Sequence, residues 1–440
     1  MRTSRHVVAA VLLASVVFAP ATASGAAGDL DRSFGHDGVA VTDVFHGAFD
    51  TAYGIVEQPN GKIVVAGTVE TSAGERFCVL RYRANGKLDP TFGGDGRETT
   101  SFGGSFQQAR DVAIQNGKIV VAGTAEASGG TAFALARYLP DGTLDPSFGS
   151  SGRVLAHIAA GSIDSASALL VLPSGDLVVA GSTLSPTSTP SDFAAARFDP
   201  SGTPMSSFGG DGTVTVDFGG RDDRATSLTR AAGGGIVLAG SSEVDGSSDF
   251  ALAELRANGD PAPAFGTGGI ERTTFGGADP VPSEALDVQT LPSGKLIAIG
   301  SVFVGPMIRE HDAALARYRT DGSLDPTFGS GGLVTTDLGS PHGDDVAISV
   351  AIQANGKIVT AGTTSIKTFM YDHRFAVSRY LTDGTLDAGF GSDGSVTTDF
   401  GKGWDLARDV IVAGDGTILA AGEAGSSRGG DIAVARYRAA

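Results

Sequence analysis

A segment of 56–63 residues recurs seven times along the chain and carries the same landmarks in the same order. The landmarks are an Ala-Gly step, an Arg-Tyr step and a Phe-Gly step, as at Gly67, Arg81 and Phe92. The phenylalanines of the last step are Phe34, Phe92, Phe148, Phe208, Phe265, Phe328 and Phe390. A repeat has to be recognised before length is converted into a number of domains, so the 440 residues indicate one repeat architecture.

Each copy contains four short runs typical of β-strands, separated by Gly, Asp, Asn and Pro. In the sixth copy they are residues 346–353, 357–362, 375–380 and 395–400, here named strands A, B, C and D. Four strands repeated seven times predict an all-β fold, a seven-bladed β-propeller, since propellers use four to eight blades of four strands. A β-solenoid or paired barrels are the alternative, because the period is longer than in most propeller repeats.

The phase of the repeat predicts how the ring closes. The chain enters the array with a strand D, within residues 30–44, and leaves it just after strand C of the seventh copy, at Arg436 and Tyr437. The N-terminal strand D is therefore expected to pair into the last blade, which removes the open sheet edges of an unclosed ring. Residues 24–440 are then a single propeller domain.

Residues 1–23 have the features of a secretory signal peptide. Arg2 and Arg5 form a basic start, residues 7–19 an apolar run, and Ala21-Thr22-Ala23 a small-residue cleavage site. The apolar run is too short to span a bilayer. The mature protein is therefore expected to be secreted and extracellular, without membrane insertion.

The net charge limits the classes of partner, and the cysteine content limits the covalent chemistry of the chain. The formal net charge of −17 disfavours nucleic acids and anionic membranes, because both need clustered Lys and Arg. Cys78 is the only cysteine, so it forms no disulfide within the chain, and its place in strand C predicts a buried, unreactive thiol. We expect a monomer whose partner is a small ligand, a glycan or a protein.

The repeat contains the motifs LDPSFG (residues 144–149), GSVTTDFG (394–401) and FALARY (133–138). With these motifs it resembles the delta-60 repeat family of bacterial, largely extracellular proteins, over nearly all of residues 30–437. The resemblance implies a propeller-forming repeat without a common chemistry, so it assigns no catalytic residue. Copies four and five depart from the pattern, for example with Glu254 in place of the arginine.

The spacing of the landmarks separates constant loops from variable ones. Eleven positions always separate the Arg and Phe columns, as from Arg81 to Phe92, so the C–D links and the A–B turns form a constant face, here called the turn face. The B–C and D–A loops form the opposite face, here called the loop face. Blades five and six have the longest B–C loops, with 17 positions from Gly300 to Arg317. Variable loops on a rigid scaffold are where binding usually resides.

The loops of blades five and six and the connections beside them hold the candidate site residues. Histidines and carboxylates there can bind a divalent metal or act as acid and base, while aromatic rings can stack on a sugar or another flat ligand. The candidates are Glu310, His311, Asp312, His342, Asp344, Asp345, Tyr371, Asp372, His373 and Trp404. Asp345, His311 and His373 are the candidate metal ligands. The alternative is that all of these are solvated turn residues that close strands.

Two columns of aspartate recur around the loop face. The column that starts strand A contains Asp50, Asp164, Asp223, Asp345 and Asp405. The column that ends strand D contains Asp43, Asp217, Asp337 and Asp399. Both columns can attract Ca²⁺ or a cationic ligand, since hard cations prefer several oxygen ligands. Their recurrence favours a structural role instead, in which each aspartate caps N–H groups of its own turn; no other cofactor is expected.

The recurring arginines are expected to have a structural role. In four copies an aspartate follows the arginine by eight residues, as Asp89 follows Arg81, which predicts an ion pair across the C–D link. Copy three lacks the aspartate, so Arg197 needs another partner. The last arginine, Arg436, has no aspartate downstream, and Asp31 from the N-terminal segment is expected to pair with it across the closure.

The mature sequence contains no nucleophile elbow, phosphate-binding loop, nucleotide fingerprint or zinc-finger spacing. It therefore favours a secreted, non-catalytic propeller that binds its partner through the loop face of blades five and six. The alternative is an extracellular hydrolase or lyase with a His/Asp site, with or without a metal, on that same face. Its acid, base or ligands would come from His311, His342, His373, Asp344, Asp345 and Asp372.

Overall fold

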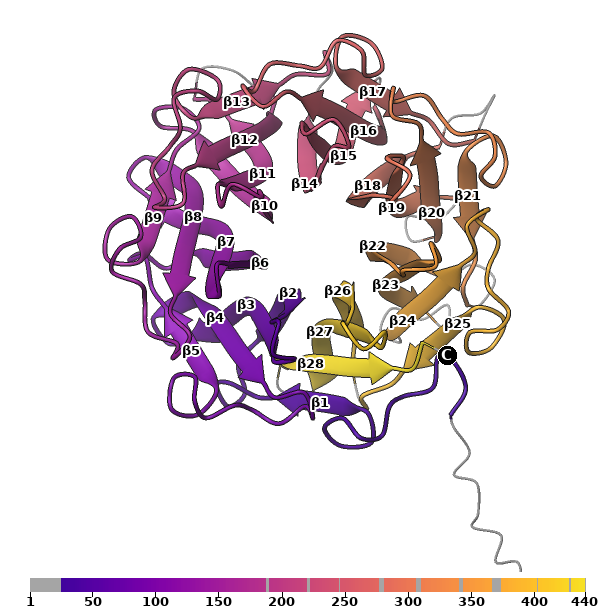
Figure 1. Ribbon diagram of the computed structural model, residues 1–440, viewed down its shortest axis with the longest axis horizontal. Helices are drawn as coiled ribbons and strands as arrows, with labels where there is room; N and C mark the ends of the chain where they lie inside the picture. Colours follow the sequence, from indigo (N-terminus) through magenta and orange to yellow (C-terminus); the bar gives the residue numbers. More distant parts are fainter. Residues whose placement is uncertain are drawn as a thin grey trace, which may run out of the picture.

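A computed structural model describes residues 25–186, 190–219, 222–244, 246–276, 281–305, 310–339, 343–365, 373–401, 403–426 and 429–439. These residues form seven antiparallel sheets of four strands, arranged as blades around a central channel (Figure 1). No helix occurs in the part of the chain that is described. The predicted seven-bladed propeller is confirmed.

The strands occupy the same four positions in every blade, from the channel outward. The innermost, strand A, is β2 (Asp50–Glu57), β6 (Gln107–Gln115), β10 (Ile163–Val171), β14 (Asp223–Arg230), β18 (Ser283–Thr290), β22 (Val346–Ile352) or β26 (Asp405–Val412). Strand B is β3 (Ile63–Thr71), β7 (Lys118–Ala127), β11 (Leu177–Leu184), β15 (Ile236–Val244), β19 (Leu296–Phe303), β23 (Ile358–Ser365) or β27 (Ile418–Ser426). Strand C is β4 (Gly74–Tyr82), β8 (Gly130–Tyr138), β12 (Asp192–Phe198), β16 (Ser247–Leu255), β20 (His311–Tyr318), β24 (His373–Tyr380) or β28 (Gly429–Tyr437). The outermost, strand D, is β5 (Arg97–Thr100), β9 (Arg153–Ala156), β13 (Thr213–Val216), β17 (Ile270–Thr273), β21 (Leu333–Thr336), β25 (Ser395–Thr398) or β1 (Val39–Thr42).

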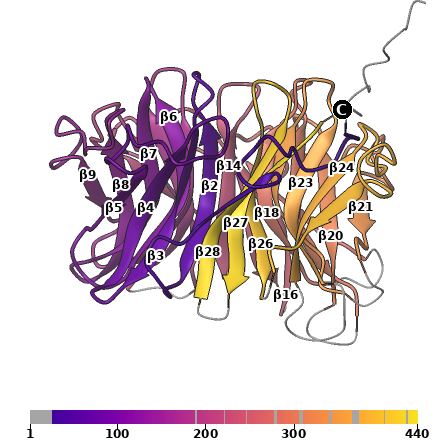
Figure 2. The same ribbon diagram turned by 90° about the horizontal axis from the view of Figure 1, so that it is seen from below.

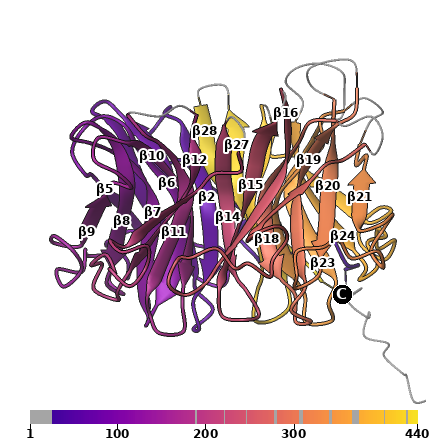
Figure 3. The ribbon, with the colours of Figure 1, turned by 90° about the horizontal axis from the view of Figure 1, so that it is seen from above.

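Seen edge-on from two opposite sides, the strands run between the two faces of the ring and the connections gather at both ends (Figures 2 and 3). Every connection from strand D of one blade leads to strand A of the next blade. The D–A and B–C connections therefore emerge on the loop face, and the A–B and C–D connections on the turn face.

The ring closes through the N-terminal strand, as the repeat phase predicted. Strand β1 pairs antiparallel with β28, with Val39 opposite Ala435 and Thr42 opposite Ile432. In Figure 1 the indigo β1 accordingly lies outside the yellow β28. The outer edge of the seventh C strand is thus covered by the start of the chain, and both ends are fixed in one sheet.

The Ala-Gly step of strand B is explained by a β-bulge in strand A. In each blade the A–B register shifts by one residue, as between Ala52 and Gly54 in the first. A Cβ built on Gly67 would lie 2.0 Å from the carbonyl oxygen of Thr51, far inside van der Waals contact. Only glycine leaves room for that carbonyl, and the bulge it permits turns the extra residue, Tyr53, toward the channel.

The sixth copy shows where the predicted strand bounds were imprecise. Strand β23 continues to Ser365 and β24 begins at His373, so the B–C hairpin extends further toward the loop face than residues 362 and 375. The extension is real pairing, since Ser365 lies opposite His373. The alternation of apolar residues in the sequence ends before the hydrogen-bonded pairing of β23 and β24 does, because the last paired residues are polar.

The core lies between neighbouring blades and is built from the recurring landmarks. All seven phenylalanines of the Phe-Gly step are at most 1% exposed, which stabilises the fold by about 1.5–3 kcal/mol each. The tyrosines of the Arg-Tyr step reach a threonine at the end of the preceding D strand. Tyr138 donates to Thr100 at 2.7 Å, and across the closure the Tyr82 and Thr42 hydroxyls are 2.8 Å apart. Cys78 is fully buried, as predicted.

The predicted ion pairs across the C–D link are present. Nε of Arg81, Arg137, Arg317 and Arg379 lies 2.7–2.9 Å from the aspartate eight residues on. Arg197, which lacks that aspartate, pairs instead with Asp176 at 2.7 Å. These guanidinium groups also donate to a carbonyl of the next blade, for example Arg197 to Ala257 at 2.7 Å. The arginine column therefore joins strands within a blade and also joins adjacent blades.

Candidate functional site

The loop face differs from the turn face in its exposed side chains. Eight large apolar residues are substantially exposed in the described part of the chain, and none of them lies in an A–B or C–D turn. Two, Val41 and Leu155, are on outer D strands. The other six are on the loop face: Phe45, Phe49, Phe106, Ile163, Val304 and Trp404. Exposed apolar surface on one face of a rigid scaffold is typical of an interaction site.

Four of these six occupy the same position in consecutive blades. Each directly precedes, in blades seven, one, two and three, the residue that caps the start of strand A. They are Trp404 (50% exposed), Phe49 (63%), Phe106 (38%) and Ile163 (54%). Each of the four residues stands at the start of an A strand, and the A strands surround the channel (Figure 1), so the four positions lie around the mouth of the channel on the loop face. We call this set the apolar arc; the remaining blades have Asp222, Pro282 and Asp344 at that position.

The aspartates that start strand A cap their turns, as their recurrence favoured. One oxygen of each accepts a backbone N–H of the D–A connection, for example from Leu338 to Asp345 at 2.6 Å and from Phe400 to Asp405 at 2.9 Å. In blade two Gln107 takes the same role toward Phe102, at 2.6 Å. Burial raises the pKa of Asp345 to about 6 despite these donors. The column holds the D–A connections in place beneath the apolar arc.

The candidate residues of blade five form one close pair. His311 begins β20, and its Nδ1 lies 2.8 Å from Oδ1 of Asp344, in the connection that enters blade six. The hydrogen bond to Asp344 raises the pKa of His311, with a further contribution from the charge of Glu284. The ring also makes an edge contact with Phe303, at 5.7 Å between centroids. A histidine oriented in this way by a carboxylate has the arrangement of a general acid or base.

The candidates of blade six belong to a different boundary. His373 begins β24, and its ring lies 6.2 Å from that of Trp404, in the connection that enters blade seven. Both histidines start a C strand, which is the third strand outward from the channel. The structure thus places His311 and His373 in equivalent positions of two blades, each beside its own D–A connection.

The other candidates are distributed as follows. Glu310 is buried next to His311, and the half-buried Asp312 has a pKa raised by burial and by the charge of Asp337. His342, Tyr371 and Asp372 lie outside the described residues. Two groups of three carboxylates have oxygens within 4.8 Å of one another in the described part, and neither contains His311, His373 or Asp345.

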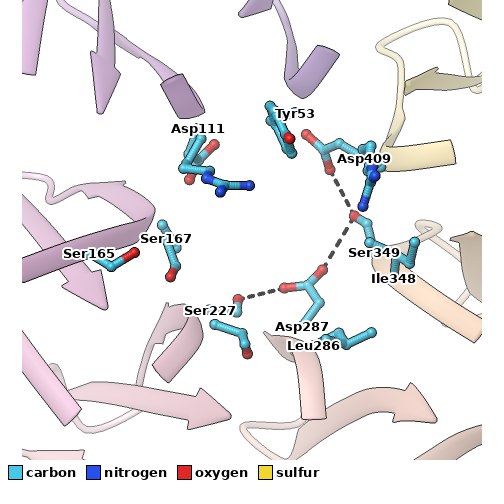
Figure 4. A pocket seen from close by; sticks show the side chains of 14 residues that line it. Tyr53, Asp111, Ser165, Ser167, Ser227, Leu286, Asp287, Ile348, Ser349 and Asp409 are labelled. Carbon is cyan, nitrogen blue, oxygen red and sulfur yellow. Dashed lines mark hydrogen bonds between the residues drawn. The ribbon is translucent and has the colours of Figure 1, made fainter. Parts of the chain in front are cut away.

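A polar pocket lies in the channel itself. It has a volume of about 370 Å³ and is lined by residues from all seven A strands (Figure 4). The guanidinium groups of Arg110 and Arg408 lie 4.4 and 5.5 Å from the ring centre of Tyr53. Two cations therefore share one aromatic ring, an arrangement that can hold an anionic or polar group entering the channel.

Three aspartates also face the channel, and they join neighbouring blades. Asp111 accepts the N–H of Leu169 at 2.7 Å, and Asp409 that of Ile55 at 2.7 Å. Asp287 accepts the N–H of Val350 at 2.8 Å, and the Ser349 hydroxyl links it to Asp409 (Figure 4). Burial, with the charge of neighbouring carboxylates, raises the pKa of Asp111 to about 8 and that of Asp409 to about 7.

Part of each of six repeats matches the profile of a known protein family. Six segments match the profile of a family described as a domain of unknown function (DUF5122) beta-propeller: residues 58–92, 114–148, 172–208, 234–265, 291–328 and 353–390. Each segment runs from the end of strand A or the A–B turn to the phenylalanine of the Phe-Gly step. The chain is a β-propeller repeat protein. No curated protein sequence matched it.

Several solved structures resemble this repeat protein in fold. A protein of unknown function from Dyadobacter fermentans is 12% identical, with a TM-score of 0.47 over 92% of this chain and 98% of that one. The polysaccharide lyase Uly1 is 11% identical, with a TM-score of 0.49 over 88% and 90%. Sqt1 from Chaetomium thermophilum is 12% identical, with a TM-score of 0.41 over 92% and 98%.

The repeat protein has functional candidates that sequence reasoning missed. The apolar arc is visible in the sequence as the residue before each strand A cap, in the dipeptides Phe49-Asp50, Phe106-Gln107 and Trp404-Asp405. The channel aspartates recur as Asp-Val pairs, such as Asp111-Val112. Within the described residues, no helix has the length and apolar character needed to cross a membrane.

Proposed function

We propose that this protein is a secreted, non-catalytic binding module that holds a polypeptide partner on its loop face, around the channel mouth. The apolar arc carries the proposal. Four consecutive blades present Trp404, Phe49, Phe106 and Ile163 to solvent at one rim position. Burying such side chains contributes about 25 cal/mol per Å² of apolar surface removed from water, so a partner that covers the arc gains affinity. We also propose that the repeats are of the delta-60 type and that the protein is a monomer.

The chemistry of the rim favours a partner that is both apolar and basic. Ile163 offers no ring on which a sugar can stack, whereas an aliphatic or aromatic side chain of a peptide packs against all four arc residues. The rest of the rim includes Asp222 and Asp344, and the chain carries a net charge of −17. Positive charge on the partner would therefore speed its association with this face.

The loops of blades five and six extend the same surface. Asp344 lies at the rim position of blade six, His311 pairs with it from the start of β20, and Val304 is exposed in the adjacent B–C loop. In this proposal the arc supplies most of the affinity, and the longer loops of blades five and six select the partner.

A peptide array and a glycan array test the proposal together. We expect binding to peptides that combine Arg or Lys with Phe, Trp or Leu, and loss of that binding in the double variant Phe49→Ser/Phe106→Ser. The control is Leu155→Ser, which removes an exposed apolar residue from the outer strand β9 and should leave binding unchanged. Binding to glycans alone would contradict a polypeptide partner, and equal loss in both variants would contradict a role for the arc.

A second candidate function rests on the His311–Asp344 pair. An extracellular hydrolase or lyase needs an oriented acid or base, and His311 is held by a carboxylate 2.8 Å away. Release of reducing sugar, or ultraviolet absorbance of unsaturated products, from a panel of polysaccharides would support this function if His311→Ala abolished it. His36→Ala is the control, because His36 is a fully solvated histidine on the turn face. Activity that is equal in both variants would exclude His311 from catalysis.

A further inference from the structure

Each blade boundary on the loop face brings three positions together: one near the start of strand C, one after strand D, and the cap at the start of the next strand A. At the boundary between the last and first blades these are Asp431, Asp43 and Asp50. At the boundary between blades three and four they are Asp192, Asp217 and Asp223. In both sets the three residues offer oxygens within 4.8 Å of one another.

The first set contains a buried carboxylate oxygen that the protein leaves unsatisfied. Asp50 is fully buried, and its Oδ2 accepts the N–H of Val44 at 2.6 Å. Its Oδ1 has no hydrogen-bond partner among the described residues, and the same is true of Oδ1 of Asp43. Leaving buried carboxylate oxygens unpaired is costly, so these two atoms indicate a missing positive partner.

Blade three shows how the fold satisfies the same atom elsewhere. Asp164, the equivalent cap, accepts the hydroxyl of Thr183 at 2.6 Å through Oδ1. Thr183 lies opposite Asp164 in strand B. The residue opposite Asp50 is Val69, which has no group to donate. The donor found in blade three is therefore replaced by an apolar side chain at the boundary that closes the ring.

Two other boundaries contain a built-in basic group. Between blades six and seven, Arg374 takes the C-strand position and pairs with Asp399. Between blades two and three, His157 takes the position after strand D, and its Nδ1 lies 3.3 Å from Asp164. At the closing boundary all three positions are carboxylates. Among the described residues, the one basic group paired with these carboxylates is the exposed His46, 2.9 Å from Oδ2 of Asp43.

We propose that Asp43, Asp50 and Asp431 bind a calcium ion that fastens the closure of the ring. Ca²⁺ takes six to eight oxygen ligands and accepts water molecules among them, so three carboxylates around one point suit it. The ion would join β28, the segment after β1 and the start of β2, which come from both ends of the chain. Asp192, Asp217 and Asp223 repeat the geometry and form the second candidate site on the opposite side of the ring.

Thermal unfolding of the purified protein in EDTA and in increasing CaCl₂ tests the site. We expect Ca²⁺ to raise the Tm in a saturable way, with half of the effect at about 0.1–1 mM, the range of extracellular calcium modules. Asp431→Asn should lose a large part of the rise and bind one ⁴⁵Ca²⁺ fewer in equilibrium dialysis. In EDTA the same variant should melt no lower than the wild type, because it removes repulsion between like charges.

Asp312→Asn is the matched control. Asp312 occupies the position of Asp431 in blade five, but Oδ1 of the cap there, Asp345, accepts the Thr364 hydroxyl. Its calcium response should equal that of the wild type. If Asp431→Asn does not fold, Val69→Thr serves instead: a hydroxyl supplied to Asp50 should raise the Tm in EDTA and weaken the calcium response. An unchanged wild-type Tm in 10 mM CaCl₂, or an equal rise in Asp431→Asn, would overturn the proposal.

Discussion

Nη2 of Arg436 lies 2.6 Å from Oδ2 of Asp31, so the arginine of the last repeat pairs with an aspartate near the start of the array. The same guanidinium group donates to the carbonyl of Ala84, in the first blade, at 2.7 Å. In four other blades the arginine and its aspartate are only eight positions apart in the sequence. The closing blade therefore reproduces a local contact with residues from both ends of the chain.

Deletion of residues 30–44 should lower the Tm strongly, because it removes β1, the buried Phe34 and the partner of Arg436. The exposed edge of β28 should also promote association through strand pairing. Differential scanning calorimetry and light scattering measure both effects. Asp31→Asn, which keeps β1, is the control and should lower the Tm by less than the deletion does. A deleted protein with an unchanged Tm and no aggregation would contradict closure by the N-terminal strand.

Asp89→Asn should destabilise the first blade. Asp89 and Arg81 are both only 3% exposed in their side chains, and breaking a buried pair on one side costs about 3–5 kcal/mol. Asp37→Asn, at an exposed His–Asp contact, should change the free energy of unfolding by less than about 1 kcal/mol. Urea unfolding followed by fluorescence compares them. Equal effects of the two substitutions would show that the repeated pair is not a source of stability.

Gly67→Ala should be strongly destabilising, although alanine is favoured over glycine in most strands. The added Cβ would lie 2.0 Å from the Thr51 carbonyl oxygen, so either the bulge in strand A or the pairing of strands A and B has to be distorted. The expected loss is above about 2 kcal/mol. Gly233→Ala is the control, since nothing lies within 4 Å of its added Cβ, and it should be neutral or slightly stabilising. Thermal unfolding of the two variants measures the difference, and an equal Tm in both would contradict the steric argument.

The landmarks of the repeat allowed the fold to be predicted because most of their contacts are local or recur seven times. Arg81 and Asp89 are eight residues apart, so their pairing follows from the spacing alone. The channel lining did not follow, because the bulge shifts the register and a strict two-residue alternation misplaces Tyr53. The apolar arc was missed because one position holds Trp, Phe and Ile in different blades. The set Asp43, Asp50 and Asp431 joins distant parts of the chain only after the ring has closed.

Stability should fall between about pH 4 and pH 8 because of the channel aspartates. The folded-state pKa of Asp111 is raised to about 8, well above its ordinary value of 3.8, so the protonated form is favoured by folding. Its stabilising contribution is complete below the ordinary pKa and is lost as the pH rises through about 8. Asp111→Asn cannot ionise, so its Tm should depend less on pH between about 5 and 8.5 and should rise relative to that of the wild type as the pH increases. A parallel decline in both proteins would assign the effect to other groups.

The His311–Asp344 pair should be detectable by NMR as a histidine that titrates above its ordinary range. The hydrogen bond to Asp344 is the main cause of the raised pKa, so Asp344→Asn should bring the titration of His311 down. Because folding raises the pKa of His311, the pair stabilises the fold fully below pH 6.5. This contribution is lost as the pH rises through the higher folded-state pKa. Asp37→Asn, a solvated carboxylate beside His36, is the control and should leave the His311 resonance unchanged. If Asp344→Asn left the titration where it was, the two side chains would not be paired in solution, and the acid–base candidate would lose the observation on which it rests.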